Sequence, residues 1–316
     1  MDKLQTLAYY LLYGVCYCIS LLPLKILYVI SDGLFLIVYH LIRYRRQIVR
    51  HNLVSSFPEK SEQEIAGIER KFYHWFCDYF LESIKLLSIS EKTLRRHFSS
   101  TNPELVEQCF ADGQDVATFT GHYGNWEWMS CLGIDLRADR VVGCIYHPLR
   151  NAAFDQLFKK IRSHVGGVPI PKKDILRYLA DYNARGIRSM FGYIGDQGPK
   201  WENIHLWLPF LNHDTPVFTG GERIARKKKQ ACLYLDIQRP RRGQYVGTYH
   251  LITREPQTLE EHEVTRRFFQ LLEQSIQRQP EYYLWTHNRW KRTHEEFDRR
   301  FEVINGKVHP RQTVTE

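Results

Sequence analysis

The sequence predicts a mixed α/β fold in which a largely parallel sheet is flanked by helices and preceded by an apolar, helical membrane anchor. Three observations lead to this fold class. Short apolar runs alternate with helical patterns from residue 115 onward, which is typical of parallel strands joined by helical crossovers. The first 42 residues are mostly apolar. No linker, repeat or low-complexity stretch interrupts residues 43–316, so we expect a single domain there.

The N-terminal region predicts a membrane anchor over residues 1–42. No charged residue occurs from Leu4 to Leu24, a run of 21 residues, and about 20 apolar residues cross a bilayer as a helix. A second apolar run over 26–42 contains only Asp32 as a charge, and Pro23 predicts a break between the two segments. A signal peptide and a buried helix pair are alternatives, but an anchor that spans the membrane or lies in its interface is favoured by the basic residues that follow, Arg43, Arg45, Arg46 and Arg50.

The charge and cysteine content narrow the class of protein. The formal charge of +9 and the sequence pI of about 9.1 indicate an anionic partner, which could be nucleic acid, a phospholipid surface or an acidic protein. The seven cysteines are scattered and form no CxxC pair. This spacing argues against a disulfide framework and a zinc site, and favours buried thiols in a reducing compartment.

The elements of the main domain follow from capping signals and periodicity. Ser61 and Glu64 form a capping box that opens a helix with an aromatic stripe. The pattern then predicts strands at 116–120, 141–146, 189–194, 231–238 and 245–252, and helices at 126–132, 153–164, 174–184 and 260–279.

The segment Thr-Gly-His-Tyr-Gly-Asn-Trp-Glu, residues 120–127, is the strongest candidate for a catalytic site. It follows a predicted strand, and ligands bind at the carboxyl ends of strands in open α/β sheets. If His122 lies in the turn and Glu127 in the first helical turn, the two side chains can meet. Asp196 follows the apolar run 190–194, so it is expected at the same sheet edge, although a turn-forming role is an alternative.

A histidine next to a carboxylate suits general base catalysis. Neutral imidazole can take a proton from a hydroxyl group near physiological pH, and a carboxylate on the other ring nitrogen fixes the tautomer. The hydroxyl can belong to a substrate, and backbone amides near 121–125 could stabilise the oxyanion. The chain has no HExxH metal motif and no GxSxG nucleophile motif, which disfavours a metalloenzyme and a serine hydrolase.

Residues 118–129, TFTGHYGNWEWM, resemble the first motif of the late lipid A biosynthesis acyltransferases, which transfer lauroyl and myristoyl groups within the lysophospholipid and glycerol-phosphate acyltransferase superfamily. The resemblance implies that His122 is the general base and that Glu127 orients it. It continues through 46–58, 146–155, 196–199, 219–222 and 283–292. His147 stands where the family usually has an arginine, and Arg150 is a nearby substitute. The acceptor-binding residues implied by the resemblance are Gly121, Tyr123, Asn125, Trp126, Tyr146, His147, Arg150, Asp196, Gln197 and Gly198.

The resemblance implies an acyltransferase domain at 43–316 that needs no metal or other cofactor. It would move a fatty acyl chain from acyl carrier protein or acyl-CoA to a lipid hydroxyl at the cytoplasmic face of the inner membrane. A lipid A precursor, in lipopolysaccharide biosynthesis, is the first expected acceptor, and an amino-acid-containing lipid or a lysophospholipid is the alternative. A non-catalytic basic protein that binds membranes or nucleic acid is the alternative of another class, and a hydrolase is a third.

Two basic stretches remain open to more than one interpretation. Residues 226–229, RKKK, could bind phosphate or dock an acidic carrier protein, or they could form a solvated turn or helix end. Residues 289–292 lie beside Trp285 and Trp290. Such a mixture of cations and aromatic rings occurs in nucleic-acid sites and at membrane interfaces, and the apolar N-terminus favours the membrane, with no nucleic acid as partner.

Overall fold

A seven-stranded sheet forms the centre of the computed structural model, which describes residues 3–133, 139–304 and 307–311. The outer limits predicted for the anchor and the domain, residues 1 and 316, lie outside the described residues. The strand order is β1-β9-β8-β2-β5-β3-β4. Neighbouring strands from β8 to β4 are parallel, whereas β9 is antiparallel to β8 and parallel to β1. The strands are β1 (Phe98–Thr101), β2 (Val116–Thr120), β3 (Arg140–Tyr146), β4 (Gly167–Pro171), β5 (Arg188–Ile194), β8 (Ala231–Arg241) and β9 (Gln244–Thr253).

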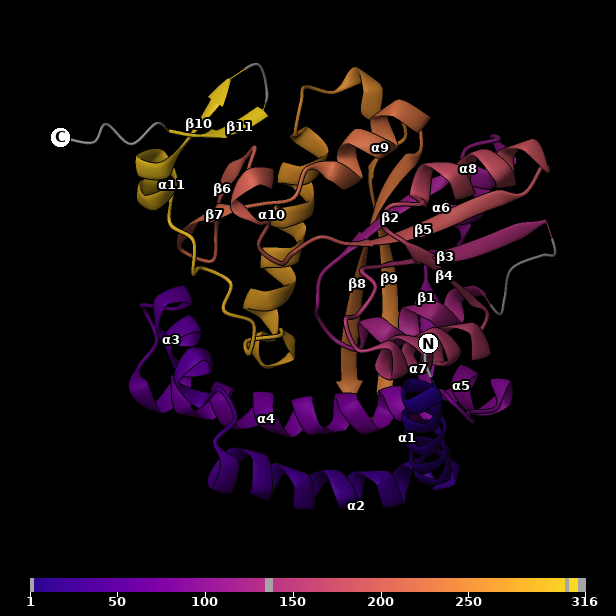
Figure 1. The fold of residues 1–316 in the computed structure, drawn as a ribbon, viewed down its shortest axis with the longest axis vertical. Helices are drawn as coiled ribbons and strands as arrows, with labels where there is room; N and C mark the ends of the chain where they lie inside the picture. The colour runs from indigo at the N-terminus through magenta and orange to yellow at the C-terminus, as the bar shows by residue number, and fades with distance from the viewer. Residues whose placement is uncertain (1–2, 134–138, 305–306, 312–316) are drawn as a thin grey trace.

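Helices cover the sheet, as the prediction of an α/β fold requires (Figure 1). Helix α10 packs on β2, β8 and β9, whereas α8 packs on β4 and β5. Phe119 of β2 lies between Tyr193 of the next strand and Phe268 of α10, at ring-centroid distances of 5.4 and 5.7 Å. The helices of this region are α6 (Glu104–Ala111), α7 (Ala152–His164), α8 (Ile175–Ala184), α9 (Gly220–Lys228) and α10 (Glu263–Arg278).

The N-terminal helices gather at the lower edge of the molecule in Figure 1 and contribute to the same hydrophobic core as the sheet. The break predicted at Pro23 is confirmed, because α1 ends at Leu21 and α2 begins at Leu24. The helices α1 and α2–η1 are each long and apolar enough to cross a membrane, by length and composition alone. The elements are α1 (Lys3–Leu21), α2 (Leu24–Phe35), the π-helical η1 (Leu36–Ile42), α3 (Arg46–Ser56), α4 (Glu62–Lys85) and α5 (Glu91–His97).

The remaining elements are short, and all of them except η2 lie in the C-terminal half of the chain. Two antiparallel pairs stand outside the main sheet, and Figure 1 shows one of them, β10–β11, at the upper left beside the last helix. These elements are η2 (Trp126–Gly133), η3 (Trp201–Asn203), β6 (Trp207–Phe210), β7 (His213–Pro216), η4 (Pro256–Thr258), η5 (Pro280–Tyr282), α11 (His294–Arg300), β10 (Phe301–Ile304) and β11 (Lys307–Pro310).

The local sequence signals account for much of this arrangement. The capping box is confirmed: the Ser61 hydroxyl accepts from the Glu64 amide, and the Glu64 carboxylate accepts from the Ser61 amide. All five predicted strands are present, although the last two form an antiparallel hairpin. The segment predicted as a helix at 126–132 is a 3₁₀ helix, and the predicted helices at 153–164, 174–184 and 260–279 are confirmed within three residues at each end.

Candidate active site

The ends of two neighbouring strands bring the candidate catalytic residues together. Strands β2 and β5 are parallel partners whose last residues, Thr120 and Ile194, stand opposite each other. The Gly195 amide donates to the Thr120 carbonyl at 3.3 Å, so the chain segments stay together beyond the strands. His122 and Asp196 each lie two residues past these paired ends. The expectation that both residues occupy one sheet edge is therefore confirmed.

The loop that carries His122 is fixed by close backbone contacts. Gly124 has a φ of +62°, and a side chain there would place its Cβ 2.5 Å from the Ile237 carbonyl oxygen. Its amide donates to the Tyr282 carbonyl at 2.9 Å, and the Leu284 amide donates to the His122 carbonyl at 3.1 Å. Glycine is thus required for both conformation and space. The Gly124 amide was one of the expected oxyanion donors, but in this structure it already has a partner.

His122 has a different polar partner on each ring nitrogen. Its Nδ1 lies 2.7 Å from Asp196 Oδ1, and its Nε2 lies 3.2 Å from Gln197 Nε2. The amide nitrogen of Gln197 can only donate, so Nε2 accepts and the proton of the neutral ring lies on Nδ1. The Trp126 ring meets the imidazole edge-on at a centroid distance of 5.0 Å. This is the tautomer in which Nε2 can act as a base.

Buried neighbours keep the Asp196 carboxylate charged. Burial on its own would raise the pKa of Asp196, which is 1% exposed. The positive charge and hydrogen bond that His122 can provide outweigh this effect, so the pKa of Asp196 is lowered. His287 lies in the same buried region, and burial lowers its pKa to about 4. Asp196 is therefore an anion, and His287 is neutral, at physiological pH.

Glu127 pairs with Arg162 and not with His122, the partner that we expected. Arg162 of α7 donates from Nε and Nη2 to the two Glu127 oxygens at 2.9 and 2.8 Å. Both side chains are largely buried: Glu127 is 5% exposed and Arg162 is 17% exposed. Glu127 opens the 3₁₀ helix η2, which packs toward α7, whereas His122 points to the end of β5. The expected His122–Glu127 contact is thus replaced by two pairs, His122–Asp196 and Glu127–Arg162.

A cavity of about 740 Å³ opens beside His122 and Glu127. One part of its lining is apolar and comes from the strands β2 and β5 and the helices α9 and α10. These residues include Phe119, Tyr193, Ile224 and Phe268. Another part carries the cations Arg162, Lys172 and Arg223. A cavity of this size with mixed lining can hold a ligand that has both an apolar chain and anionic groups.

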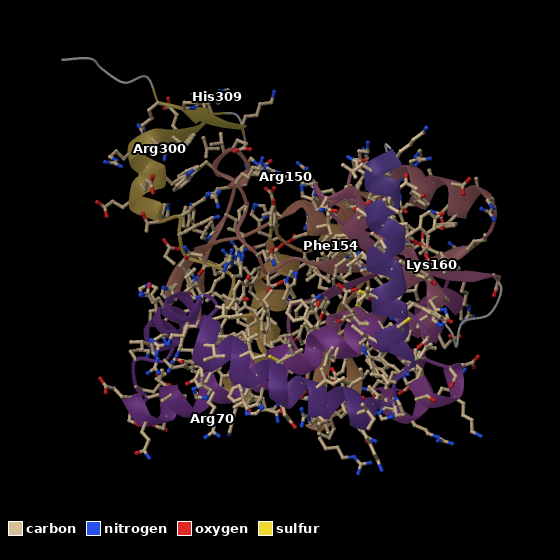
Figure 2. The ribbon with its side chains drawn as sticks, turned by 60° about the horizontal axis from the view of Figure 1, so that its bottom comes forward. Arg70, Arg150, Phe154, Lys160, Arg300 and His309 are labelled. Carbon is tan, nitrogen blue, oxygen red and sulfur yellow. The ribbon has the colours of Figure 1, made fainter. Side chains whose placement is uncertain are left out.

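The residues that the sequence assigned to acceptor binding fall into three groups. Four of them line the cavity: Trp126, Tyr146, His147 and Gln197. Arg150 is exposed, and Figure 2 shows it on the side of the molecule where α7 begins.

The other predicted acceptor residues are used inside the fold. Tyr123 donates to the Gln279 carbonyl at 3.2 Å, and Asn125 donates to the Glu82 carboxylate at 2.8 Å. A Cβ on Gly121 would stand 2.6 Å from Leu272, and one on Gly198 would stand 3.2 Å from Arg289. Asp196 is buried behind His122. These contacts position the loops on both sides of His122.

Sequence reasoning missed several residues of the cavity. Arg162 lies on a predicted helix but gave no sign of reaching Glu127. Phe119 lies on β2, before the loop that carries His122, and alternates with the polar residues Thr118 and Thr120. This alternation was the one signal in the sequence that Phe119 points to the opposite face of the sheet from these two neighbours. Gly221 and Phe268 come from helices that pack over the sheet only in the folded chain.

The two basic stretches have structural partners. Residues 226–228 form the last turn of α9, where the helix dipole stabilises cations. Arg226 also donates to the carbonyls of Leu259 and Glu260 at 2.8 and 3.0 Å. The membrane-interface interpretation of the second stretch is wrong for Trp285 and Arg289, because they are 1% and 2% exposed. Trp285 instead donates to the Pro280 carbonyl at 2.6 Å and belongs to the core.

Comparison with known proteins finds similarity to the lipid A acyltransferases. A family model described as bacterial lipid A biosynthesis acyltransferase matches residues 1–292. A lipid A biosynthesis lauroyltransferase of Escherichia coli (strain K12) is 24% identical over 285 residues, which cover 88% of this chain and 89% of that protein. The match includes the N-terminal helices and the loops at the ends of β2 and β5.

Proposed function

Because the chain belongs to the bacterial lipid A biosynthesis acyltransferase family, we propose that it transfers a fatty acyl group from a thioester to a hydroxyl group of a lipid A precursor. The donor is acyl carrier protein or coenzyme A carrying the acyl chain. One observation carries the proposal: His122 lines a cavity that has apolar and cationic walls, while Asp196 holds its Nδ1 at 2.7 Å. This arrangement supports a base that acts on a hydroxyl of an amphipathic substrate.

The proposed reaction uses His122 as a general base and then as a general acid. Nε2 takes the proton from the acceptor hydroxyl, and the oxygen forms a bond to the thioester carbonyl carbon. The tetrahedral intermediate then breaks its carbon–sulfur bond, and the leaving thiolate takes the proton back from the imidazolium. Asp196 stabilises the imidazolium while it exists. The products are an ester and a free thiol, with no acyl-enzyme.

The cavity walls suggest how the two substrates are held. The apolar residues Phe119, Tyr193 and Phe268 suit the acyl chain, because its burial removes apolar surface from water. Lys172 and Arg223 line the cavity and are also exposed to solvent, so they are available to phosphate groups. In this proposal the ion pair of Glu127 and Arg162 forms the wall beside His122, and Glu127 acts on the site through Arg162.

We also propose that the protein works at the cytoplasmic face of the inner membrane. Two apolar N-terminal helices and the lipid A family support this location. The thioester donors are soluble in the cytoplasm, whereas the acceptor is a membrane lipid. The basic composition, with a net charge of +9, favours an anionic bilayer surface.

Lipid mass spectrometry on whole cells tests the proposal. Cells would express the intact chain, His122→Ala or His309→Ala at equal protein levels. The matched control residue His309 is an exposed histidine on β11, which Figure 2 shows far from α7. We expect a lipid A species heavier by one acyl chain with the intact chain and with His309→Ala, and none with His122→Ala. Equal acylation by the His122 variant would refute the mechanism.

A reaction with purified components then identifies the substrates. The protein in detergent would receive a lipid A precursor, a lysophospholipid or an amino-acid-containing lipid, each with acyl carrier protein or coenzyme A as the carrier. Transfer to the lipid A precursor alone is the expected result. Transfer to another lipid would correct the acceptor, and release of free fatty acid without transfer would indicate a hydrolase.

A further inference from the structure

The two apolar N-terminal helices lie on one face of the catalytic domain. Figure 1 shows α1 almost end-on and α2 lengthwise, both at the lower edge. In Figure 2, where that edge is turned forward, both helices cross in front of the domain. Helix α2 packs along α4, and α1 packs on α7 and α4. Each helix therefore runs along the surface of the domain and does not extend away from it.

Buried polar contacts hold α2 against α4. Tyr28 donates to Glu82 at 2.9 Å and Ser31 donates to Asp78 at 2.6 Å. Arg242 of the β8–β9 turn donates to both Asp32 and Asp78 at 2.7 Å. Asp78 and Glu82 are at most 2% exposed. These donors from α2 add to those that Asp78 receives from Arg239 of β8 and Glu82 from Tyr245 of β9. Helix α2 thus shares in satisfying two buried carboxylates and belongs to the fold of the domain.

Helix α1 is held in the same way at its C-terminal end. The Lys85 ammonium donates to the carbonyls of Ser20 and Leu22 at 2.6 and 3.0 Å, and Ser88 donates to the Ser20 carbonyl at 2.7 Å. Ser20 is fully buried, and Cys16 belongs to the main core. These contacts fix the corner between α1 and α2, and with it the direction of both helices.

The outward side of both helices is apolar, and we call it the apolar plate. It comprises the exposed apolar side chains of α1 and α2–η1, among them Leu4, Leu11, Val15, Val29, Leu36 and Leu41, which are 56–76% exposed. Exposed cations stand at its borders: Lys3, Lys25, Arg43 and Arg45. An apolar face with a cationic border is typical of a helix that lies in the interface of an anionic membrane.

The neighbours of the plate are too polar to follow it through a bilayer. Helix α7 lies beside α1 and carries the exposed Gln156 and Lys160, and Figure 2 shows Lys160 next to α1. Helix α4 lies beside α2 and carries the exposed Arg70 and Lys71. If either apolar helix crossed the bilayer in this structure, these charges would enter the hydrocarbon core, where a charge is strongly disfavoured.

We propose that α1 and α2–η1 lie flat in one leaflet of an anionic phospholipid bilayer and that neither helix crosses it. The inference rests on the membrane location proposed above. It places the catalytic domain directly on the lipid surface. Leu149, which lines the cavity, and Phe154 on α7 are 46% and 45% exposed, and Figure 2 shows Phe154 beside α1. Helix α7, which packs on α1, also contributes Asp155, Phe158 and Arg162 to the cavity lining, so an acceptor lipid would pass from the leaflet along α7 to reach the cavity.

Cysteine labelling tests the flat orientation. Among the cysteines that the structure describes, Cys18 is exposed and the others are buried. A Cys18→Ser background therefore removes the exposed thiol and keeps only buried ones. The single substitution Lys3→Cys reports the start of α1, Lys25→Cys reports the first turn of α2, and Glu59→Cys reports the domain. A membrane-impermeant maleimide would be added to spheroplasts and to inverted inner-membrane vesicles.

We expect all three cysteines to react in the inverted vesicles and to be protected in the spheroplasts. Reaction of Lys25→Cys in spheroplasts would show a spanning hairpin, and reaction of Lys3→Cys there would show that α1 alone spans. Either result overturns the proposal, and both are independent of enzyme activity.

Vesicle flotation tests which surface holds the membrane. The full chain would be mixed with vesicles of phosphatidylethanolamine and phosphatidylglycerol. We expect the double substitution Val29→Asp and Leu41→Asp to reduce the bound fraction at least tenfold. The control is Val303→Asp, an apolar position on β10 that is 51% exposed and lies at the opposite edge in Figure 1, and it should bind like the parent.

Undiminished binding of the double variant, with an unchanged thermal midpoint, would show that another surface holds the lipid. Self-association of the parent without vesicle binding would show that the plate packs against a second copy. Either result contradicts the proposal. Acyl transfer to a detergent-dispersed acceptor separates this failure from a failure of the proposed reaction.

Discussion

Asp196 Oδ1 lies 2.7 Å from His122 Nδ1 although 74 residues separate the two in the sequence. The contact exists because β2 and β5 are neighbouring parallel strands that end at the same level. The carboxylate that can orient the proposed base therefore belongs to Asp196, in the loop after β5, and not to the loop that carries His122. The predictions below separate the roles of the groups around this contact.

Asp196→Asn should greatly reduce turnover and leave substrate binding almost unchanged. The amide keeps the size of the side chain but removes the charge that stabilises the imidazolium and can favour the wrong tautomer. We expect kcat to fall about 10²- to 10⁴-fold, the usual range for general acid–base catalysis. Steady-state kinetics would measure this, with Asp214→Asn as control, since Asp214 is 53% exposed beside His294. A loss below tenfold would show that Asp196 does not orient His122.

Glu127→Gln should destabilise the protein, because it leaves Arg162 buried without its counter-charge. Removal of one partner from a buried ion pair typically costs about 3–5 kcal/mol. The double variant Glu127→Gln and Arg162→Gln should lose less than the sum of the two single variants. Denaturant unfolding of all four proteins measures this coupling. A stable Glu127→Gln variant without activity would instead indicate that Glu127 acts directly in the chemistry.

Gln197→Ala should reduce turnover far less than Asp196→Asn does. Gln197 donates to His122 Nε2 at 3.2 Å, which is the atom that must accept the proton of the acceptor hydroxyl. The acceptor must therefore displace this amide, so its removal does not weaken the base. We expect kcat within about tenfold of the parent, far above Asp196→Asn. If Gln197→Ala were as inactive as Asp196→Asn, the amide itself would take part in the reaction.

Gly221→Ala should shift the preference toward shorter acyl chains. A Cβ at this position would stand 3.0 Å from Phe119 and 3.1 Å from Tyr193, so the added methyl group crowds two rings that line the cavity. Loss of room for one methylene group removes about 0.8 kcal/mol of binding, roughly a fourfold change. Competition between donors of different chain length measures the shift. Gly67→Ala is the control, since its Cβ would have nothing within 4 Å. An unchanged chain-length profile would place the acyl chain elsewhere.

Acid should destabilise the protein partly through His287. Burial lowers its pKa from 6.5 to about 4, so the unfolded chain takes up the proton first as the pH falls. The stability is complete above pH 6.5 and decreases toward pH 4, by about 3 kcal/mol for this group. Denaturant unfolding at pH 7 and pH 4.5 should show a smaller decrease for His287→Gln than for the parent. His74 and His213, whose pKa values are also lowered by burial, are present in both proteins. Equal decreases would show that His287 is not protonated on unfolding.

The sequence allowed the main strands and the sheet edge of the site to be predicted, because periodicity and strand–helix alternation are local properties. The partner of His122 could not be predicted in this way. Glu127 is nearer in sequence, but the turn at Gly124 and the packing of η2 direct it to Arg162. The sequence did not predict β1, which has only four residues, or β4, whose Pro169 and Pro171 disfavour a strand.

Aromatic and cationic residues near the C-terminus show the same limit from another direction. Trp285 and Arg289 have the composition of a surface site, yet both are buried. Their environment depends on Pro280 and Pro216, whose carbonyls they bind at 2.6 Å in each case. Composition identifies which residue types are present, but the surroundings of each residue arise from contacts between distant segments.

The Glu82 carboxylate receives hydrogen bonds from Tyr28 of α2, from Asn125 of the His122 loop and from Tyr245 of β9, at 2.9, 2.8 and 2.6 Å. A truncated chain that begins at residue 43 would lose the first of these donors. It would thereby change the support of the loop that carries His122. Deleting the apolar helices is therefore a poor route to a water-soluble enzyme for crystallography or inhibitor screening. Detergent or nanodisc preparations of the full chain preserve the environment in which any inhibitor of this site must bind.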